Sequence, residues 1–174
     1  MYESGWSHRR TEWEDCIRKM QHTQTLLRPP RISVIERFEE VRDQAGWPND
    51  PRKGQERPRD PAGRRWSLCF ALLIGDCYYL FSESTSHQHD WYAEYDLKIG
   101  QPNGQAQRIN AHVWQRRYDR ALVIANLPGA QSAYEVVLDQ PAKDTLSGQA
   151  GTRFNIPPGD GRILLDQDHG TSSR

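Results

Sequence analysis

The apolar residues of this 174-residue chain change their pattern near His112, and the change limits the folds open to it. Before it, two apolar stretches of helical length alternate with two short runs rich in β-branched and aromatic residues. After it, five short strand-like runs follow one another, separated by turn residues. Alternating helices and strands are typical of parallel α/β units, whereas strands joined by tight turns are typical of antiparallel sheets. The sequence therefore predicts an α+β chain in two parts, residues 1–100 and 101–174.

The first part opens on a predicted helix. Thr11 and Glu14 have the spacing of a capping box, and the apolar residues beyond them recur at helical intervals. Two prolines, Pro29 and Pro30, end the helix because proline cannot supply the next backbone amide. The face expected in the core carries Trp13, Cys16, Ile17, Met20 and Leu27.

Two short strands and a second helix are expected next. Residues 31–38 are typical of a buried strand, and residues 77–81 form a second, aromatic one. Four prolines and many charges predict a long loop over residues 43–63. A buried helix follows over residues 66–74, ended by Gly75 where a left-handed cap is favoured.

The second part is predicted to be an antiparallel β-domain, a small β-sandwich or a curled sheet, with a tail that frays from Gln167 onward. Tight turns separate its strands. The strand-like runs are residues 113–118, 121–126, 133–138, 152–156 and 161–165.

Charge and length exclude several classes of protein. The chain has 23 Lys and Arg residues against 23 Asp and Glu residues, so it has no basic face for nucleic acid or an anionic membrane. No run approaches the ~20 apolar residues of a membrane span, and no signal-like stretch follows Met1. We expect a soluble chain, cytoplasmic as written, and leave open the secretion of a longer parent. A complete α/β barrel needs about 250 residues, so it cannot be formed by this chain alone.

Metal and cofactor chemistry have little support. His87 and His89, two positions apart and followed by Asp90, suggest a metal site. Catalytic zinc normally takes three protein ligands, however, and the sequence does not indicate a third. The three cysteines lack a C-x-x-C spacing, and Cys69 falls in an apolar helix where a thiol is usually inert. Phosphate-binding loops and hydrolase nucleophile elbows are also absent. No metal and no cofactor are expected.

Several short sequence motifs, together with their order along the chain, resemble the carboxy-terminal part of an uncharacterised family of proteins similar to glycoside hydrolases. That family is built as an α/β barrel followed by a small all-β domain. Ala121 and Cys77 stand where its pattern prefers glycine. The matching motifs are residues 91–96 for W-x-x-E-Y-D, 97–102 for L-G-x-P, 114–126 for the entry into the β-domain, and 157–165 for its close.

The resemblance implies a fold and a function. Residues 1–100 would be the end of a (β/α) barrel with about two α/β units, and residues 101–174 the β-domain that braces it. The ligand of this chain would be a poly- or oligosaccharide. The complete parent protein would carry out the hydrolysis, and this fragment alone would be inactive. Because parallel strands need covered faces, residues 1–100 are expected to be loosely packed, associated, or docked on the β-domain.

The resemblance also implies the site. Glycosidic cleavage uses two carboxyl groups across the scissile bond, and a barrel presents them at the carboxyl ends of its strands. The carboxylates placed there are Glu36, Asp90, Glu94 and Asp96. The aromatic residues of a sugar-stacking wall are Trp91, Tyr92 and Tyr95.

A second hypothesis is a non-catalytic carbohydrate-binding or protein-interaction module that uses the aromatic segment and the β-sheet face. The oligomeric state is left open.

Overall fold

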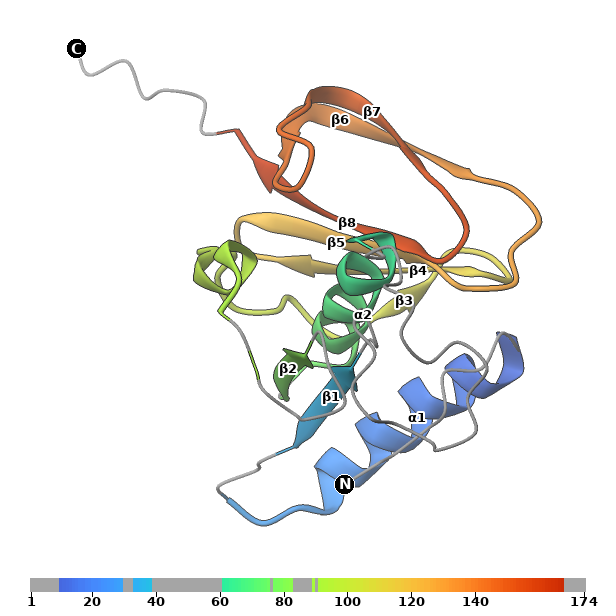
Figure 1. The fold of residues 1–174 in the computed structure, drawn as a ribbon, viewed down its shortest axis with the longest axis vertical. Helices are drawn as coiled ribbons and strands as arrows, with labels where there is room; N and C mark the ends of the chain where they lie inside the picture. The colour runs from blue at the N-terminus through green and yellow to red at the C-terminus, as the bar shows by residue number, and fades with distance from the viewer. Residues whose placement is uncertain are drawn as a thin grey trace, which may run out of the picture.

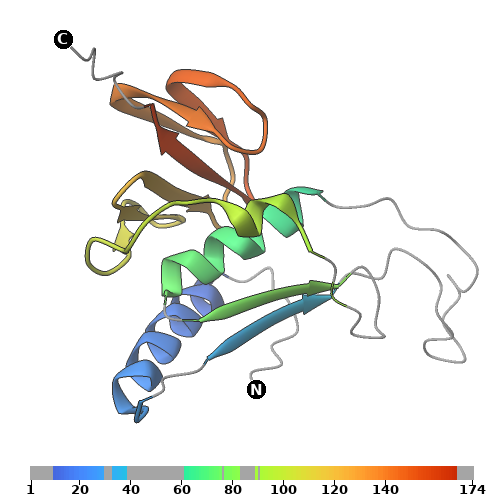
Figure 2. The same ribbon diagram turned by 90° about the vertical axis from the view of Figure 1, so that its left-hand side faces the viewer.

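Two sheets of different kinds form the protein, and one long helix lies between them (Figure 1, Figure 2). The computed structural model describes residues 10–29, 33–38, 61–75, 77–82, 89 and 91–167. The first part of the chain contains α1 (Arg10–Leu26), β1 (Val34–Phe38), α2 (Pro61–Ile74), β2 (Tyr78–Ser82) and the 3-10 helix η1 (Ala93–Asp96). The second contains β3 (Gln107–Arg108), β4 (Val113–Tyr118), β5 (Ala121–Asn126), β6 (Tyr134–Asp144), β7 (Ala150–Ile156) and β8 (Asp160–Asp166).

The smaller sheet consists of β1 and β2, which pair in parallel. Helix α2 connects them and covers one face, where Ile35 and Tyr79 pack against its apolar side chains. On the opposite face Val34 and Tyr78 are partners in register and are 44% and 65% exposed. The described part therefore contains one parallel βαβ unit with a covered face and an open face.

The larger sheet has six strands in the order β3-β4-β5-β8-β6-β7, all paired antiparallel. Strand β6 joins β8 only over residues 142–144, and the β6–β7 ribbon folds back over β5 and β8 (Figure 1). The antiparallel α+β prediction is confirmed in this coarse form. The six strands do not divide into the two sheets of a β-sandwich. They form one hydrogen-bonded sheet that curls around an apolar core of its own, the other of the two predicted forms.

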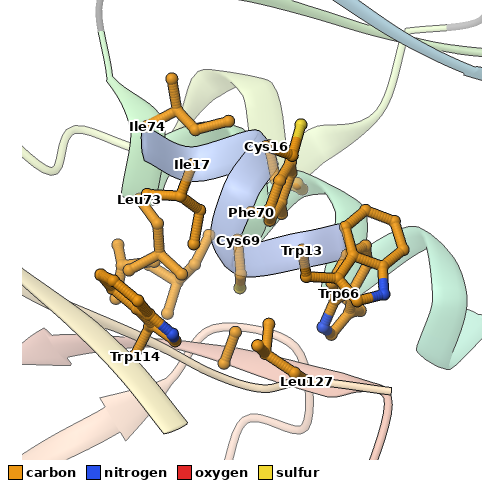
Figure 3. Packing of buried hydrophobic residues seen from close by; sticks show 14 of the residues in the cluster. Trp13, Cys16, Ile17, Trp66, Cys69, Phe70, Leu73, Ile74, Trp114 and Leu127 are labelled. Carbon is orange, nitrogen blue, oxygen red and sulfur yellow. The ribbon is translucent and has the colours of Figure 1, made fainter. Parts of the chain in front are cut away.

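Strand β5 shows why the layers hold together. Ala121, Val123 and Ala125 face the core cluster that contains α2, whereas Leu122 and Ile124 face the cluster under the β6–β7 ribbon. This alternation is the period of two expected of a strand, and it buries β5 on both faces. The first cluster also takes Trp13, Cys16, Ile17, Trp66, Phe70, Leu73, Trp114 and Leu127 (Figure 3).

Several element boundaries differ from those predicted. Helix α2 begins at Pro61, within the stretch expected to be a loop, because proline suits the first helical position where no amide is needed. The rest of that predicted loop lies outside the described residues, as does the tail beyond Gln167. Strand β6 runs on through Pro141, and its pairing with β7 is irregular between Val137 and Ala142. The capping role expected of Thr11 involves side chains that the structure does not describe.

Of the three expected states of residues 1–100, the described part shows docking on the larger sheet. Helix α2 lies so close to β8 that a Cβ atom added to Gly161 would lie 2.7 Å from both Cβ and Sγ of Cys69. Ordinary van der Waals contact begins near 3.4 Å, so the helix or the strand would have to shift. A glycine is therefore needed at this crossing point.

We expect Gly161→Ala to lower the free energy of unfolding by about 1–3 kcal/mol, because overpacking a close contact forces the backbone apart. Gly151→Ala is the matched control, since Gly151 also lies in a strand and its added Cβ would meet nothing within 4 Å. Urea denaturation of both variants measures the difference. Equal losses from the two substitutions would contradict the close helix-to-strand contact.

Candidate functional site

Glu36 lies on the open face of the parallel sheet. Ile35 packs toward α2, and successive side chains of a strand point to opposite faces, so Glu36 points away from the helix. It lies two residues before the end of β1, opposite Leu80 of β2. The sequence placed Glu36 at the end of the first strand, whereas the structure makes it the middle residue of β1, with its side chain on the open face.

His89 contacts Glu36 on this face. Nε2 of His89 lies 2.8 Å from Oε1 of Glu36, within hydrogen-bond distance, and Nε2 is the donor when the carboxyl group is ionised. The backbone of His89 forms an isolated antiparallel bridge with Ser82 at the end of β2. The His89 side chain is 30% exposed and the Glu36 side chain is 20% exposed, so the pair is partly shielded from water. The two strand ends and His89 therefore form one polar site.

The predicted aromatic residues come together, but on the other side of the sheet. Tyr95 packs edge-on against Tyr79, and Tyr92 packs edge-on against Phe81, with ring centroids 5.9 and 5.6 Å apart. Tyr79 belongs to the face covered by α2, so η1 lies beside that helix (Figure 2). Burial raises the pKa of the Tyr79 and Tyr95 phenols, which keeps both hydroxyls protonated.

Trp91 is the outermost member of the aromatic group. Its ring packs edge-on against Tyr95 with centroids 5.4 Å apart, and its Nε1 donates to Oδ2 of Asp96 at 3.0 Å. The side chain is nevertheless 73% exposed. Trp91 therefore presents an aromatic face to solvent in a fixed orientation.

Glu94 is held by an arginine of α2. Nη2 of Arg64 lies 3.3 Å from Oε1 of Glu94, and the Arg64 guanidinium lies 4.2 Å from the centre of the Tyr92 ring. These contacts attach η1 to the first turns of α2. Glu94 and Asp96 thus bind partners within the η1–α2 group, apart from the Glu36–His89 pair, and Asp90 lies outside the described residues.

Sequence reasoning missed two participants in these contacts. The sequence suggested His89 only as a possible metal ligand, and it gave no sign that Arg64 belongs to the site. His89 lies 53 positions from Glu36, and only the strand pairing brings them together. His87 and Asp90, the other two residues of the metal hypothesis, lie outside the described residues.

Two of the three cysteines, Cys16 and Cys69, are buried and poorly suited to act as nucleophiles. Burial raises the pKa of Cys16 to about 11, and it raises the pKa of the fully buried Cys69 further. Both are therefore protonated near neutral pH, and a thiol without its thiolate form is a poor nucleophile and ligand.

Buried charged groups fix the first turns of α2, which carry Arg64, to the larger sheet. Arg65 donates two hydrogen bonds to Asp160 of β8, Nε to Oδ1 at 3.0 Å and Nη2 to Oδ2 at 2.8 Å. Arg162 adds a contact from Nη1 to Asp160 Oδ2 at 2.7 Å and reaches Asp144 Oδ2 with Nε at 3.2 Å. The network joins the helix that supports η1 to strands β6 and β8.

The last turn of α2 is capped by β4. Arg116 directs Nη1 at the carbonyl oxygens of Leu72 and Leu73, at 3.3 and 3.4 Å, and Tyr118 donates its hydroxyl to Leu72 at 2.7 Å. A cation is favourable at a helix carboxyl end, where carbonyl groups lack helical partners. Both ends of α2 are thus held by the larger sheet, and α2 in turn packs on the parallel strands β1 and β2.

Neither described helix combines the length and the apolar character needed to cross a lipid bilayer.

Comparisons with known proteins give one family match and matches to solved structures. The family described as "Hypothetical glycosyl hydrolase family 15" matches residues 1–122. A GH27 β-L-arabinopyranosidase from Geobacillus stearothermophilus matches 99% of this chain and 45% of its own, with a TM-score of 0.56 and 12% identity. A hypothetical maltooligosyl trehalose synthase from Sulfolobus tokodaii matches 35% of this chain and 8% of its own, with a TM-score of 0.30 and 17% identity. No curated protein sequence matches.

The two kinds of match support different statements. The chain spans less than half of each of the two solved structures, and at 12% identity the arabinopyranosidase shows similarity of fold alone. The family match, in contrast, includes both parallel strands, α2, η1 and the first strands of the larger sheet. Because that match extends over more than two thirds of the sequence, the chain belongs to hypothetical glycosyl hydrolase family 15.

Proposed function

We propose that this chain is the carboxy-terminal part of a glycoside hydrolase. Residues 1–100 supply the last two strands of an α/β barrel with their connecting helix, and residues 101–174 form the domain that braces them. Two parallel strands joined by a helix on one face are the repeating unit of such a barrel. Val34 and Tyr78, exposed on the opposite face, are side chains that the remaining strands of a barrel would cover.

The observation that carries this proposal is Glu36 on the open face near the carboxyl end of β1. In α/β barrels the active site is formed at that end of the strands, by side chains from several of them. We assign Glu36 as one of the two carboxyl groups of glycosidic cleavage.

The second carboxyl group must lie across the sugar from Glu36, at about 5–5.5 Å for retention or about 6.5–9.5 Å for inversion. Glu94 and Asp96 contact Arg64 and Trp91 instead, in the group beside α2. We therefore assign the second role to Asp90 or to a strand supplied by a longer parent. Without a completed carboxyl pair, this chain alone binds carbohydrate but does not hydrolyse it.

Trp91 supports carbohydrate as the ligand class. An exposed indole held by Tyr95 and Asp96 offers a flat apolar surface beside hydrogen-bonding groups, which suits the apolar face of a sugar ring. Tyr95 contacts the Trp91 ring directly, and Tyr92 in turn packs against Tyr95.

The test records binding and turnover separately for the purified chain, over a panel of aryl glycosides and oligosaccharides. We expect no turnover, and binding detected by calorimetry that weakens about tenfold in Glu36→Gln and in Trp91→Ala, the equivalent of about 1.4 kcal/mol. Glu135→Gln, a change in an exposed carboxylate of β6, is the control and leaves binding unchanged.

Other outcomes separate the alternatives. Turnover that persists in Glu36→Gln would remove Glu36 from the catalytic pair. Binding that is lost in Trp91→Ala but unchanged in Glu36→Gln would favour the non-catalytic carbohydrate-binding module, because the exposed indole would then act without the open face of the sheet.

A further inference from the structure

We infer that His89 is a positioning residue that keeps Glu36 ionised and directs its carboxylate along the open face of the parallel sheet. The catalytic meaning of this inference rests on the function proposed above. The pair itself belongs to this chain and can be tested without a substrate.

Both members of the pair are fixed by backbone pairing. Glu36 is held in β1 by its register with Leu80, and His89 is held against Ser82, which ends β2. Ser82 is fully buried, so the bridge to His89 rests on a packed part of the sheet. The backbone pairing of Glu36 and of His89 therefore sets the 2.8 Å contact between Nε2 and Oε1. A contact between two flexible surface side chains would lack this support.

The neighbouring arginines are directed elsewhere. Arg37, the next residue of β1, donates from Nη1 to the carbonyl oxygen of Gly63 at the start of α2. Arg64 binds Glu94 of η1 and covers the ring of Tyr92.

Of the other titratable groups of β2 and α2, Tyr78 shares the open face with Glu36 and is exposed, whereas the following two lie on the helix side. Tyr79 of β2 meets Ser67 of α2, and Arg65 of α2 binds Asp160. On the open face, His89 is a basic side chain in direct contact with Glu36.

The contact favours the charged form of the carboxyl group. A hydrogen bond donated to a carboxylate stabilises its ionised form, and an imidazolium adds the attraction of an opposite charge. Partial burial of both side chains weakens screening by water and salt. Of the two carboxyl groups in glycosidic cleavage, Glu36 would thus be the unprotonated one, and the acid that protonates the leaving oxygen would be its counterpart.

The experiment follows the side-chain carboxyl carbon of Glu36 by NMR while the pH is lowered, in the full chain labelled with ¹³C-glutamate. Glu36→Gln identifies the resonance by removing it. We expect the titration midpoint to lie about one pH unit higher in His89→Ala than in the unchanged chain, the lower end of the effect of a neighbouring opposite charge. His22→Ala, a change in an exposed histidine of α1, leaves the midpoint unchanged.

A second variant keeps the test decisive if His89→Ala does not fold. His89→Gln retains an N–H donor but no charge, so its midpoint should lie between the other two. Midpoints equal to that of the unchanged chain in the folded His89 variants would overturn the inference. If the midpoints shift as expected but no carbohydrate binds, the pair stands and the proposed function fails.

Discussion

Asp160→Asn lowers the free energy of unfolding by about 3–5 kcal/mol, the loss typical of removing one partner from a buried ion pair. Asp160 is 2% exposed, and its carboxylate accepts hydrogen bonds from Arg65, from Arg162 and from the Gly161 amide. The asparagine has nearly the same size, but it is neutral, so the Arg65 guanidinium loses its counter-charge and Arg162 keeps only Asp144, in a low-dielectric setting. Urea denaturation at pH 7 measures the loss.

The control for this prediction is Glu135→Gln. Glu135 pairs with Arg153 at 3.1 Å across β6 and β7, but both side chains are exposed. Exposed pairs contribute about 0–1 kcal/mol, so this variant should unfold nearly as the unchanged chain does. If Asp160→Asn lowered the free energy of unfolding as little as the control does, the ion pairs of Asp160 would not be what holds α2 on β8.

The loss from Asp160→Asn should also depend on pH. Burial alone raises the pKa of Asp160, but hydrogen bonds from Arg65, Arg162 and the Gly161 amide, together with the Arg162 charge, lower it overall. A carboxyl group with a lowered folded pKa stabilises the protein fully above its unfolded pKa of about 3.9, and the stabilisation disappears as pH falls through the folded value. The difference between the two proteins should therefore be constant from about pH 5 to 8 and shrink below about pH 4.

Local patterns were sufficient to predict much of the larger sheet. Strands β4 and β5 have the predicted bounds. The alternation of their side chains and the two-residue turn between them can both be recognised within one short stretch of sequence. Asp160, by contrast, was visible only as a turn residue beside Gly159. Its partner Arg65 lies 95 positions away, and no local signal shows which distant charge a buried carboxylate will meet.

The candidate site divides in the same way. Trp91, Tyr92 and Tyr95 were predicted as one group, and they lie together because they are neighbours in one short segment. The face of the sheet on which that segment lies was not predictable, since it depends on Arg64 of α2. The Glu36–His89 contact likewise depends on the register of two strands, which their sequences alone do not specify.

Gly75→Ala is the second substitution for which we expect a large effect, about 3–5 kcal/mol of unfolding free energy. Gly75 ends α2 with a φ of +71° and donates its amide to Ala71 at 2.9 Å. A side chain in this left-handed region costs roughly 1–2 kcal/mol. The added Cβ would also lie 1.7 Å from Nη1 of Arg116, so the buried guanidinium would have to leave the carbonyl groups that it caps, with a penalty of a few kcal/mol.

Gly148→Ala separates the two contributions, because Gly148 has a φ of +72° and its added Cβ would meet nothing within 4 Å. It should lose only the conformational part, about 1–2 kcal/mol. In an Arg116→Met background the excess cost of Gly75→Ala should fall, because contacting residues are not additive and the displaced group would be gone. Equal losses at the two glycines would show that Arg116 does not cap α2, and the parallel strands would then be held to the β-domain through Asp160 and the apolar core.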